Sequence, residues 1–283
     1  MVALSPAKRL IGRIAPRLVD YRRISRGYSG VFGRPPNVLF PTTFNEKVQR
    51  RKLLERDARF PDRVDKVRVK DFVTEKLGPG WVTPTIWHGP ALPPVSERTW
   101  PLPFVLKANH GSVMNVFVRT PAKRDWSKIE PLCAKWMGEV YGDWGGEWVY
   151  WNIKRQLLVE PFIGALAKLP LDYKLWTFHG RVEFIQVDAD RETNHTRVMF
   201  DRDWKPLPFN IHYETYQGEI PRPSSLSKML EAAEILSERV PFVRVDFYEI
   251  EEKPRFGEMT YYPDSGWARF LPHEYDAKVG ALW

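Results

Sequence analysis

Hydrophobic positions along the chain follow two periods, one of about two residues and one of about 3.6. The shorter period predicts antiparallel hairpins within residues 104–119, 171–187 and 242–261. The longer period predicts a helix from near Glu46, capped by Thr43 or Asn45, and helices over residues 66–77, 126–141 and 223–239. Apolar runs at 81–87 and 157–163 are predicted as single strands. Hairpins that alternate with single helices predict an α+β fold with antiparallel sheets, not a doubly wound one.

The most regular alternation lies in the last of these hairpins. One face of its first strand is apolar, and the other face carries Arg244 and Asp246. The chain is expected to turn near Glu252. Asp246 then lies opposite Glu258, with Cβ atoms about 5 Å apart. By the same count, Arg244 lies opposite Thr260.

Two carboxylates that face each other repel, so this pair needs a compensating charge. A bound cation or a shared proton would supply it. Mg²⁺ favours one or two carboxylates together with substrate phosphates, and Arg244 on the same face can clamp a phosphate oxygen. The alternative interpretation is a pair of surface acids on a solvated sheet face, with a β-bulge that alters the register.

A lysine at the end of a predicted strand begins a second candidate site. Lys107 is followed by a small polar turn that contains Asn109, His110, Gly111 and Ser112. Such a lysine can reach polyphosphate while the N–H groups of the loop close over it. One lysine and one glycine define no motif by themselves. We give His110 no acid–base role, because a histidine in a turn is more often a hydrogen-bonded structural residue.

A third candidate site follows the apolar strand predicted at 157–163. An adenine ring needs apolar walls and an edge donor–acceptor pair, which the backbone at a strand end supplies. Glu160, Phe162 and Ile163 occupy that end, although most such strands only form part of a core. Asp172 and Lys174 then open the next strand, with both side chains on the same face.

Composition is that of a globular protein, and the charge is concentrated at the N-terminus. The 283 residues are 43% hydrophobic and 28% charged, with a net charge of +8. Residues 1–30 hold seven Lys and Arg against Asp20 alone, a net +6. Apolar positions among them form a partly helical stripe that Pro16 is expected to interrupt. A helix packed on the body is our first interpretation of this arm, an anionic membrane surface the second, and nucleic acid the third.

The sequence also indicates a compartment. Cys133 is the only cysteine, so an intramolecular disulfide is excluded. No run approaches the roughly 20 apolar residues that cross a bilayer, and the N-terminus lacks the pattern of a secretory signal. We therefore expect a cytoplasmic protein, with peripheral membrane association as the second option.

In their order along the chain, these segments resemble the ATP-grasp superfamily, and locally the D-alanine–D-alanine ligases. The matching segments are Asp65-Lys66, Val105–Lys107, Glu160–Ile163, Arg244–Asp246 and Glu258–Thr260. The resemblance is closest to the TupA-like ATP-grasp family and extends from Thr43 to Gly266. Members of that family are associated with the biosynthesis of cell-surface polysaccharide and teichuronopeptide.

The resemblance implies an ATP site built from most of these positions. Lys66 and Lys107 would hold the phosphates of ATP beneath a lid formed by residues 109–115. Adenine would lie against the segment from Glu160 to Ile163. Asp172 would lie near the ribose and Lys174 near the triphosphate.

The resemblance also implies a metal and a transfer site. Asp246, Glu258 and Thr260 would bind Mg²⁺, while Arg244, with Lys107, would stabilise the transferring phosphoryl group. Three positions depart from the family pattern. Val113 replaces a loop glycine, Thr260 replaces the asparagine that commonly completes the metal set, and Asp264 replaces a glycine near the acceptor side.

The implied function is an ADP-forming carboxylate–amine ligase that works through an acylphosphate in the biosynthesis of a cell-surface polysaccharide or peptidoglycan-like polymer. Its partners would be a small-molecule or glycan-linked carboxylate and an amine acceptor, with no nucleic acid. One alternative is an ATP-grasp kinase acting on a sugar or lipid-linked hydroxyl, with Asp264 as a conceivable base. Another is a non-catalytic basic protein that binds membranes or nucleic acid.

The expected organisation has a basic arm and helical region over residues 1–95 and a small lobe with the phosphate loop over 96–159. A large lobe over 160–283 would hold the adenine segment and the metal-binding hairpin. In an ATP-grasp fold the two lobes clasp the nucleotide between antiparallel sheets.

Overall fold

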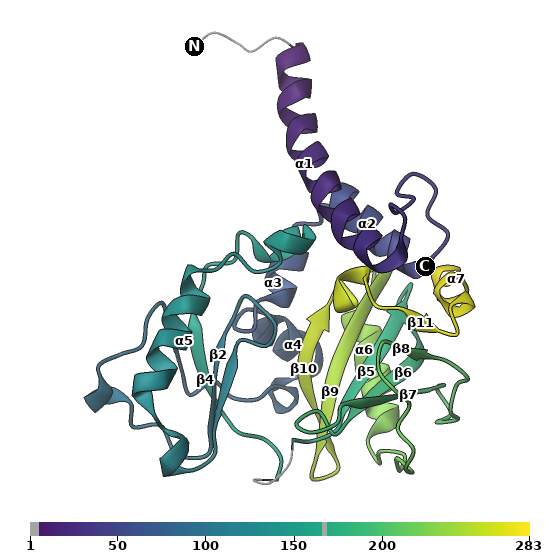
Figure 1. Cartoon of the computed structure of the whole chain (residues 1–283). Helices are drawn as coiled ribbons and strands as arrows, with labels where there is room; N and C mark the ends of the chain where they lie inside the picture. Colours follow the sequence, from purple (N-terminus) through teal and green to yellow (C-terminus); the bar gives the residue numbers. More distant parts are fainter. Residues whose placement is uncertain (1–5, 166–168) are drawn as a thin grey trace.

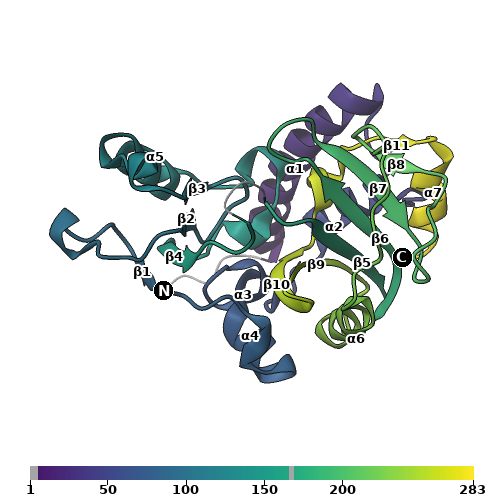
Figure 2. The ribbon, with the colours of Figure 1, turned by 90° about the horizontal axis from the view of Figure 1, so that it is seen from below.

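The computed structural model describes residues 6–165 and 169–283, and for residues 6–16 it describes the backbone alone. Two large antiparallel sheets lie side by side, each with helices of its own, and the N-terminal helix projects above them (Figures 1 and 2). A third, two-stranded sheet pairs Asn210–Ile211 with Phe270–Leu271. The predicted α+β class with antiparallel sheets and a helical N-terminal region is confirmed.

The helices are α1 (Pro6–Phe32), α2 (Phe44–Leu54), α3 (Phe60–Val64), α4 (Val69–Leu77), α5 (Trp126–Gly138), α6 (Leu226–Leu236) and α7 (Glu274–Gly280). The strands are β1 (Trp87–Gly89), β2 (Phe104–Ala108), β3 (Asn115–Val118), β4 (Leu157–Pro161), β5 (Asp172–Phe178), β6 (Arg181–Ala189), β7 (Thr196–Phe200), β8 (Asn210–Ile211), β9 (Phe242–Ile250), β10 (Lys253–Thr260) and β11 (Phe270–Leu271).

The smaller sheet has the strand order β1-β4-β2-β3. The predicted hairpin is present, with Lys107 paired to Asn115, and β4 pairs with the other edge of β2. One apolar cluster joins this sheet to α5, through residues such as Phe104, Ile129 and Trp136. The strand β1 belongs to this sheet although it precedes residue 96, the predicted start of the small lobe. The domain boundaries remain predictions.

The larger sheet has the order β10-β9-β5-β6-β7. The predicted 171–187 hairpin is confirmed, since Phe178 pairs with Arg181 around His179 and Gly180. Apolar side chains of one sheet face form the main core with α6, whose Leu226, Met229 and Leu236 are buried. The opposite face of β5 and β9 carries the polar residues described below.

Helix α2 begins as its sequence predicts. Thr43 is the N-cap: its hydroxyl accepts from the Glu46 N–H, and the Glu46 carboxylate reaches back to the cap. Arg34 also donates to Glu46, at 2.6 Å. This capping box fixes the direction in which the chain leaves α1 and enters the body.

Several predicted elements are wrong in detail. The predicted strand at 81–87 is a 3-10 turn followed by irregular chain, and pairing begins only near Trp87. Pro84 lies in this stretch and has no N–H to donate to a ladder. The predicted helix at 66–77 is shorter, and α3, which precedes it, was not predicted. Helix α1 continues through Pro16, because proline's fixed φ is compatible with a helix at the loss of one hydrogen bond.

Among the described residues, no helix is both long enough and apolar enough to cross a membrane.

Candidate functional site

A cleft of about 400 Å³ separates the two sheets. Its walls combine the end of β2, the loop after it, the end of β4 and the N-terminal turn of α4 with β9 and β10 of the larger sheet. The residues of the sequence prediction that line it are Lys66, Lys107, Gly111, Ser112, Glu160, Phe162, Ile163, Asp246 and Glu258. Segments far apart in the sequence therefore meet at one place (Figure 2).

The β9–β10 hairpin has the predicted pairing at its functional end: Asp246 lies opposite Glu258, and Arg244 lies opposite Thr260. The turn is nevertheless shifted slightly from its predicted centre at Glu252. Ile250 pairs with Lys253, so the loop has two residues, both with positive φ. That register alone would place Glu258 opposite Val245, on the core face.

A β-bulge at Gly257 corrects the register. Pairing shifts between Phe256 and Glu258, and the extra residue returns Glu258 to the face that carries Asp246. A Cβ at Gly257 would lie 3.1 Å from the Asp246 carbonyl oxygen and 3.3 Å from the Tyr248 ring. The close approach of the two strands here thus favours glycine. The bulge creates the carboxylate pair, whereas the alternative interpretation had a bulge disrupting it.

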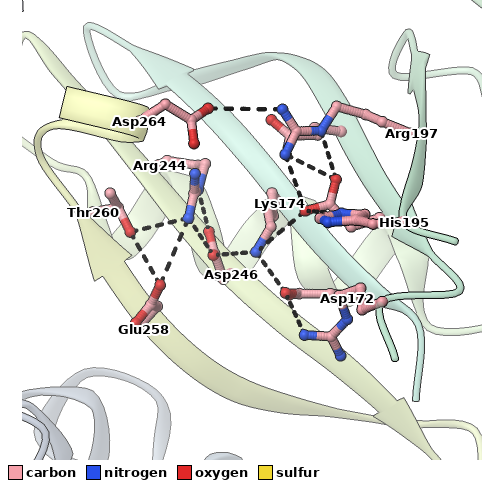
Figure 3. Close-up of polar contacts among 12 residues, drawn as sticks. Asp172, Lys174, His195, Arg197, Arg244, Asp246, Glu258, Thr260 and Asp264 are labelled. Atoms are coloured by element: carbon pink, nitrogen blue, oxygen red, sulfur yellow. Dashed lines mark hydrogen bonds and ion pairs between the residues drawn. The ribbon is translucent and has the colours of Figure 1, made fainter. Parts of the chain in front are cut away.

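Two buried cations compensate the charge of Asp246, as Figure 3 shows. Arg244 donates to both carboxylate oxygens, from Nε at 2.8 Å and from Nη2 at 2.7 Å. Lys174 on the neighbouring strand β5 donates to Oδ2 at 2.9 Å. Burial alone would lower the pKa of each cation, but the adjacent carboxylates raise both pKa values above their ordinary range. The compensating charge in the described structure is therefore supplied by side chains.

Glu258 is the more accessible member of the pair. Its Oε1 accepts from the Thr260 hydroxyl at 3.4 Å and lies 3.6 Å from Arg244. Burial would raise the pKa of Glu258, but Lys66, Lys174 and Arg244 more than offset this and lower it. The carboxylate is held ionised at the edge of the cleft.

A charge network extends from Lys174 across the sheet. Lys174 also contacts Asp172 at 2.5 Å and Asp188 at 3.9 Å (Figure 3). Arg197 binds Asp188 with Nε at 2.6 Å and Nη2 at 3.2 Å. Burial would raise the pKa of Asp188, but the adjacent His195, Lys174 and Arg197 hold it well below its ordinary range.

One acceptor in this network has no hydrogen-bond partner among the residues that the structure describes. The Oδ2 atom of Asp172 accepts from Lys174 and Arg191, whereas its buried Oδ1 atom accepts from none of the described residues. Asp172 and Lys174 lie behind Asp246 instead of lining the cleft, and Arg191, which was not predicted, lines it beside them. Sequence pattern gives no signal for Arg191, which follows the end of β6.

The opposite wall carries a second cationic group. Glu160 is held between Lys107, at 2.6 Å, and Lys70, which forms a short ion pair with its other oxygen. Burial would raise the pKa of Glu160, but the two lysines lower it below its ordinary value. Lys70 was not predicted, although it lies four residues after Lys66 and hence on the same side of the chain as it enters α4. Lys66 donates to the Gly111 carbonyl at 2.6 Å.

The loop after β2 divides into buried and exposed parts. Asn109 is fully buried and its side chain binds Asp65 and the Lys154 carbonyl. His110 is also buried, and its Nε2 lies 3.0 Å from the Trp136 carbonyl oxygen. These two side chains anchor the loop and do not line the cleft. Val113, by contrast, is 87% exposed and has a left-handed φ of 61°.

Most of the remaining lining is apolar. Phe162 packs edge-to-face on Phe117, with ring centroids 5.9 Å apart. Val82, Val105 and Phe256 also line the cleft. A flat ring would find apolar walls here, next to the backbone of Ile163.

No group of three or more His, Cys, Asp or Glu side chains is arranged to hold a metal within residues 6–165 and 169–283. The predicted metal set has two carboxylates and the hydroxyl of Thr260, which receives a hydrogen bond from Arg244 at 3.2 Å.

A comparison with known families and proteins gives one family match. The model of a family described as TupA-like ATP-grasp matches residues 46–283. None of the curated proteins compared matches the chain.

Several solved ligases have similar folds. D-alanine–D-alanine ligase from Bacillus anthracis is 17% identical, with a TM-score of 0.41 over 70% of this chain and 57% of that one. The ligase of the same name from Helicobacter pylori is 16% identical, with a TM-score of 0.41 over 77% and 59%. L-amino acid ligase from Bacillus licheniformis is 13% identical, with a TM-score of 0.45 over 88% and 50%. The chain thus spans 50–59% of the length of these ligases.

Proposed function

Because the chain belongs to the TupA-like ATP-grasp family, we propose that it binds ATP with Mg²⁺ in the cleft and joins a carboxylate to an amine. In this reaction the substrate carboxylate takes the terminal phosphoryl group of ATP and ADP leaves. The amine then attacks the acylphosphate and displaces phosphate, which leaves an amide. A glycan-linked or small-molecule acid in the synthesis of a cell-surface polymer is the proposed setting.

The observation that carries this proposal is the distribution of charge across one cleft. Lys66, Lys70 and Lys107 line one wall, while Asp246 and Glu258 line the other. A triphosphate with a divalent cation needs both kinds of wall, because the lysines match its phosphates and hard oxygen ligands match the metal.

The residues present fit such a metal. Asp246, Glu258 and the Thr260 hydroxyl would supply oxygen ligands, and substrate phosphates and water complete the coordination that Mg²⁺ prefers. When bound, the ion would offset charge on the phosphoryl oxygens. Both oxygens of Asp246 already accept hydrogen bonds from Arg244 and Lys174. If Asp246 held the metal, Arg244 and Lys174 would be free to bind the phosphates instead.

The remaining residues bind, orient and exclude water. The apolar patch around Phe162 would hold the adenine, and Glu160, kept ionised by its lysines, would accept from its amino group. The segment from Gly111 to Met114, in which Ser112 and Val113 are exposed, is placed to close over the phosphates. Arg244, at the junction of Asp246 and Glu258, would stabilise charge on the transferring group. No nucleophilic side chain is required by this scheme.

The test is ADP release with pools of uronic acids and amino acids, with Asp246→Asn as the blank. Release that requires both an acid and an amine supports the ligase. Release with a hydroxyl compound alone supports the kinase. Equal rates in Asp246→Asn and the parent chain would remove Asp246 from the site.

Calorimetry with Mg²⁺ and ATP tests the binding step separately. Lys107→Met should weaken binding about tenfold or more, since it removes a charge-assisted contact. Lys123→Met is the matched control, because Lys123 is exposed in the same lobe and does not line the cleft. Absence of any nucleotide binding by the parent chain would overturn the proposal.

A further inference from the structure

Helix α1 is attached to the body along one stripe only. Asp20, Ile24 and Tyr28 are buried, at 8%, 0% and 1% exposure, and are spaced four residues apart on one side of the helix. Gly27 permits close contact: a Cβ there would lie 2.2 Å from the ring of Trp267. Arg23 adds an ion pair with Asp143 at 2.8 Å. The C-terminal half of α1 is therefore firmly seated, and its N-terminal half extends away from the body (Figure 1).

The part of α1 just before this seat is apolar and basic at once. Leu18 and Val19 are 57% and 55% exposed. Arg17 beside them is exposed, and so are Arg22 and Arg26 within the attached part of the helix. The preceding residues add Lys8, Arg9 and Arg13 to the sequence, with no acidic residue before Asp20. Such a helix has too little apolar character to span a bilayer, and it has the composition of helices that lie in a membrane interface.

The loop from α1 to α2 presents a second apolar feature. Leu39 and Phe40 are adjacent and are 71% and 78% exposed. The loop backbone is nevertheless held in place: Arg50 Nη1 donates to the carbonyls of Val38, at 3.1 Å, and Leu39, at 2.8 Å. Asn37 Oδ1 accepts from the Phe40 N–H at 3.0 Å. This loop lies at the upper end of the molecule in Figure 1, as α1 does.

We propose that α1 and the Leu39–Phe40 tip together seat this protein on an anionic lipid surface. The basic side chains match negatively charged headgroups, while the leucine, valine and phenylalanine side chains gain by entering the acyl boundary. A nucleic acid would satisfy the charges but would leave Leu18, Val19 and Leu39 in water. The combination of positive charge with exposed aliphatic side chains therefore favours a bilayer. The inference does not depend on the proposed reaction.

The test is co-sedimentation of the full chain with vesicles. The parent chain should bind vesicles of phosphatidylcholine mixed with phosphatidylglycerol, should bind less in high salt, and should not bind phosphatidylcholine alone. The double variant Arg22→Glu/Arg26→Glu should lower the partition coefficient about tenfold or more, because each basic residue contributes to the attraction. Leu39→Ser/Phe40→Ser should lower it by a similar factor while leaving the salt dependence in place.

Matched controls come from the smaller lobe, remote from α1. Lys128→Glu/Lys135→Glu changes the same charge on exposed residues of α5, and Val95→Ser/Leu132→Ser removes comparable exposed apolar side chains. Neither should change vesicle binding. All four variants should unfold in urea at the same midpoint concentration as the parent chain, as exposed substitutions do.

Three outcomes would overturn the proposal. The first is equal binding to neutral and anionic vesicles, or none to either. The second is equal loss in the control variants, which would show a general effect of charge or hydrophobicity. The third is a failure to bind vesicles together with tight binding to RNA or DNA, or together with dimer formation in light scattering, which would assign these surfaces to a different partner.

Discussion

Replacing Asp246 by asparagine tests the charge network at its centre. The carboxylate is 1% exposed and accepts hydrogen bonds from Arg244, at 2.8 and 2.7 Å, and from Lys174, at 2.9 Å. Asparagine preserves the shape but removes the negative charge and turns an N–H₂ group toward a cation. Removing one partner of a buried pair costs about 3–5 kcal/mol. We expect about 3 kcal/mol, the lower end of that range, because Lys174 keeps Asp172 at 2.5 Å.

The measurement is urea unfolding at pH 7, followed by tryptophan fluorescence. Glu183→Gln is the matched control, since it removes the carboxylate of the Arg181–Glu183 pair on the same sheet, whose arginine side chain is 60% exposed. That change should cost less than about 1 kcal/mol. A domain with 5–15 kcal/mol of stability, the range typical of folded proteins, remains folded after losing about 3 kcal/mol. Calorimetry on the folded Asp246→Asn chain should then show that the part of ATP affinity that depends on Mg²⁺ is lost.

A stability loss no larger than that of Glu183→Gln would refute the reasoning about the network. It would mean that water or the remaining carboxylates compensate the two cations. Retained Mg²⁺-dependent binding would refute the assignment of Asp246 as a ligand, even if the stability result came out as expected. The two readouts therefore separate the structural role of this carboxylate from its role at the metal.

Further predictions concern pH, backbone strain and register. A carboxylate with a lowered pKa stabilises the fold above its unfolded pKa and loses that effect as pH falls through its folded pKa. Asp188→Asn should thus cost about 3 kcal/mol at pH 7, and its difference from the parent in urea midpoints should narrow below pH ~4; a constant difference would argue against the lowered pKa. Val113→Gly should stabilise by about 1 kcal/mol in thermal unfolding, because it relieves a left-handed φ of 61° at an exposed β-branched residue. Gly257→Ala should cost about 1–3 kcal/mol in urea unfolding, because its Cβ would crowd the Asp246 carbonyl, and should also weaken Mg²⁺-dependent binding of ATP in calorimetry; unchanged binding would show that the bulge tolerates a side chain.

The pattern of apolar and polar positions is sufficient to predict the hairpins, and the β9–β10 hairpin shows why. Alternation fixes which residues share a strand face, and symmetry about a turn fixes which of them face each other. The turn was placed near Glu252, whereas the loop has two residues, and the bulge at Gly257 restores the same pairing. The predicted pair of Asp246 and Glu258 is therefore correct because two errors cancel: the turn is one position away from its predicted place, and the bulge at Gly257 shifts the pairing back by one residue. A sequence pattern does not reveal a bulge, because the bulge is set by how closely two strands approach.

Contacts between strands or helices that are distant in sequence could not be predicted in this way. Lys174 meets Asp246 only because β5 pairs with β9, and these strands are separated by about a quarter of the chain. Lys70 reaches Glu160 only because α4 packs beneath the end of β4. In the sequence, each of these lysines is one charged residue among many. The resemblance to a family supplied Lys174 but gave no indication of Lys70.

The cations of the cleft are already engaged, and this affects how a nucleotide can bind. Lys107 is paired with Glu160, Lys66 with the Gly111 carbonyl, and Arg244 with Asp246. A triphosphate that binds here would therefore have to displace these partners. This exchange reduces the binding free energy of any anion that contacts one lysine alone, because a paired lysine loses one charge-assisted contact when it makes another. A metal-bound polyphosphate can contact several lysines, and its divalent cation can bind the carboxylates that those lysines release. Such a ligand would replace each of the lost contacts. From the paired state of these side chains we therefore expect the site to prefer a metal-bound polyphosphate over simple anions.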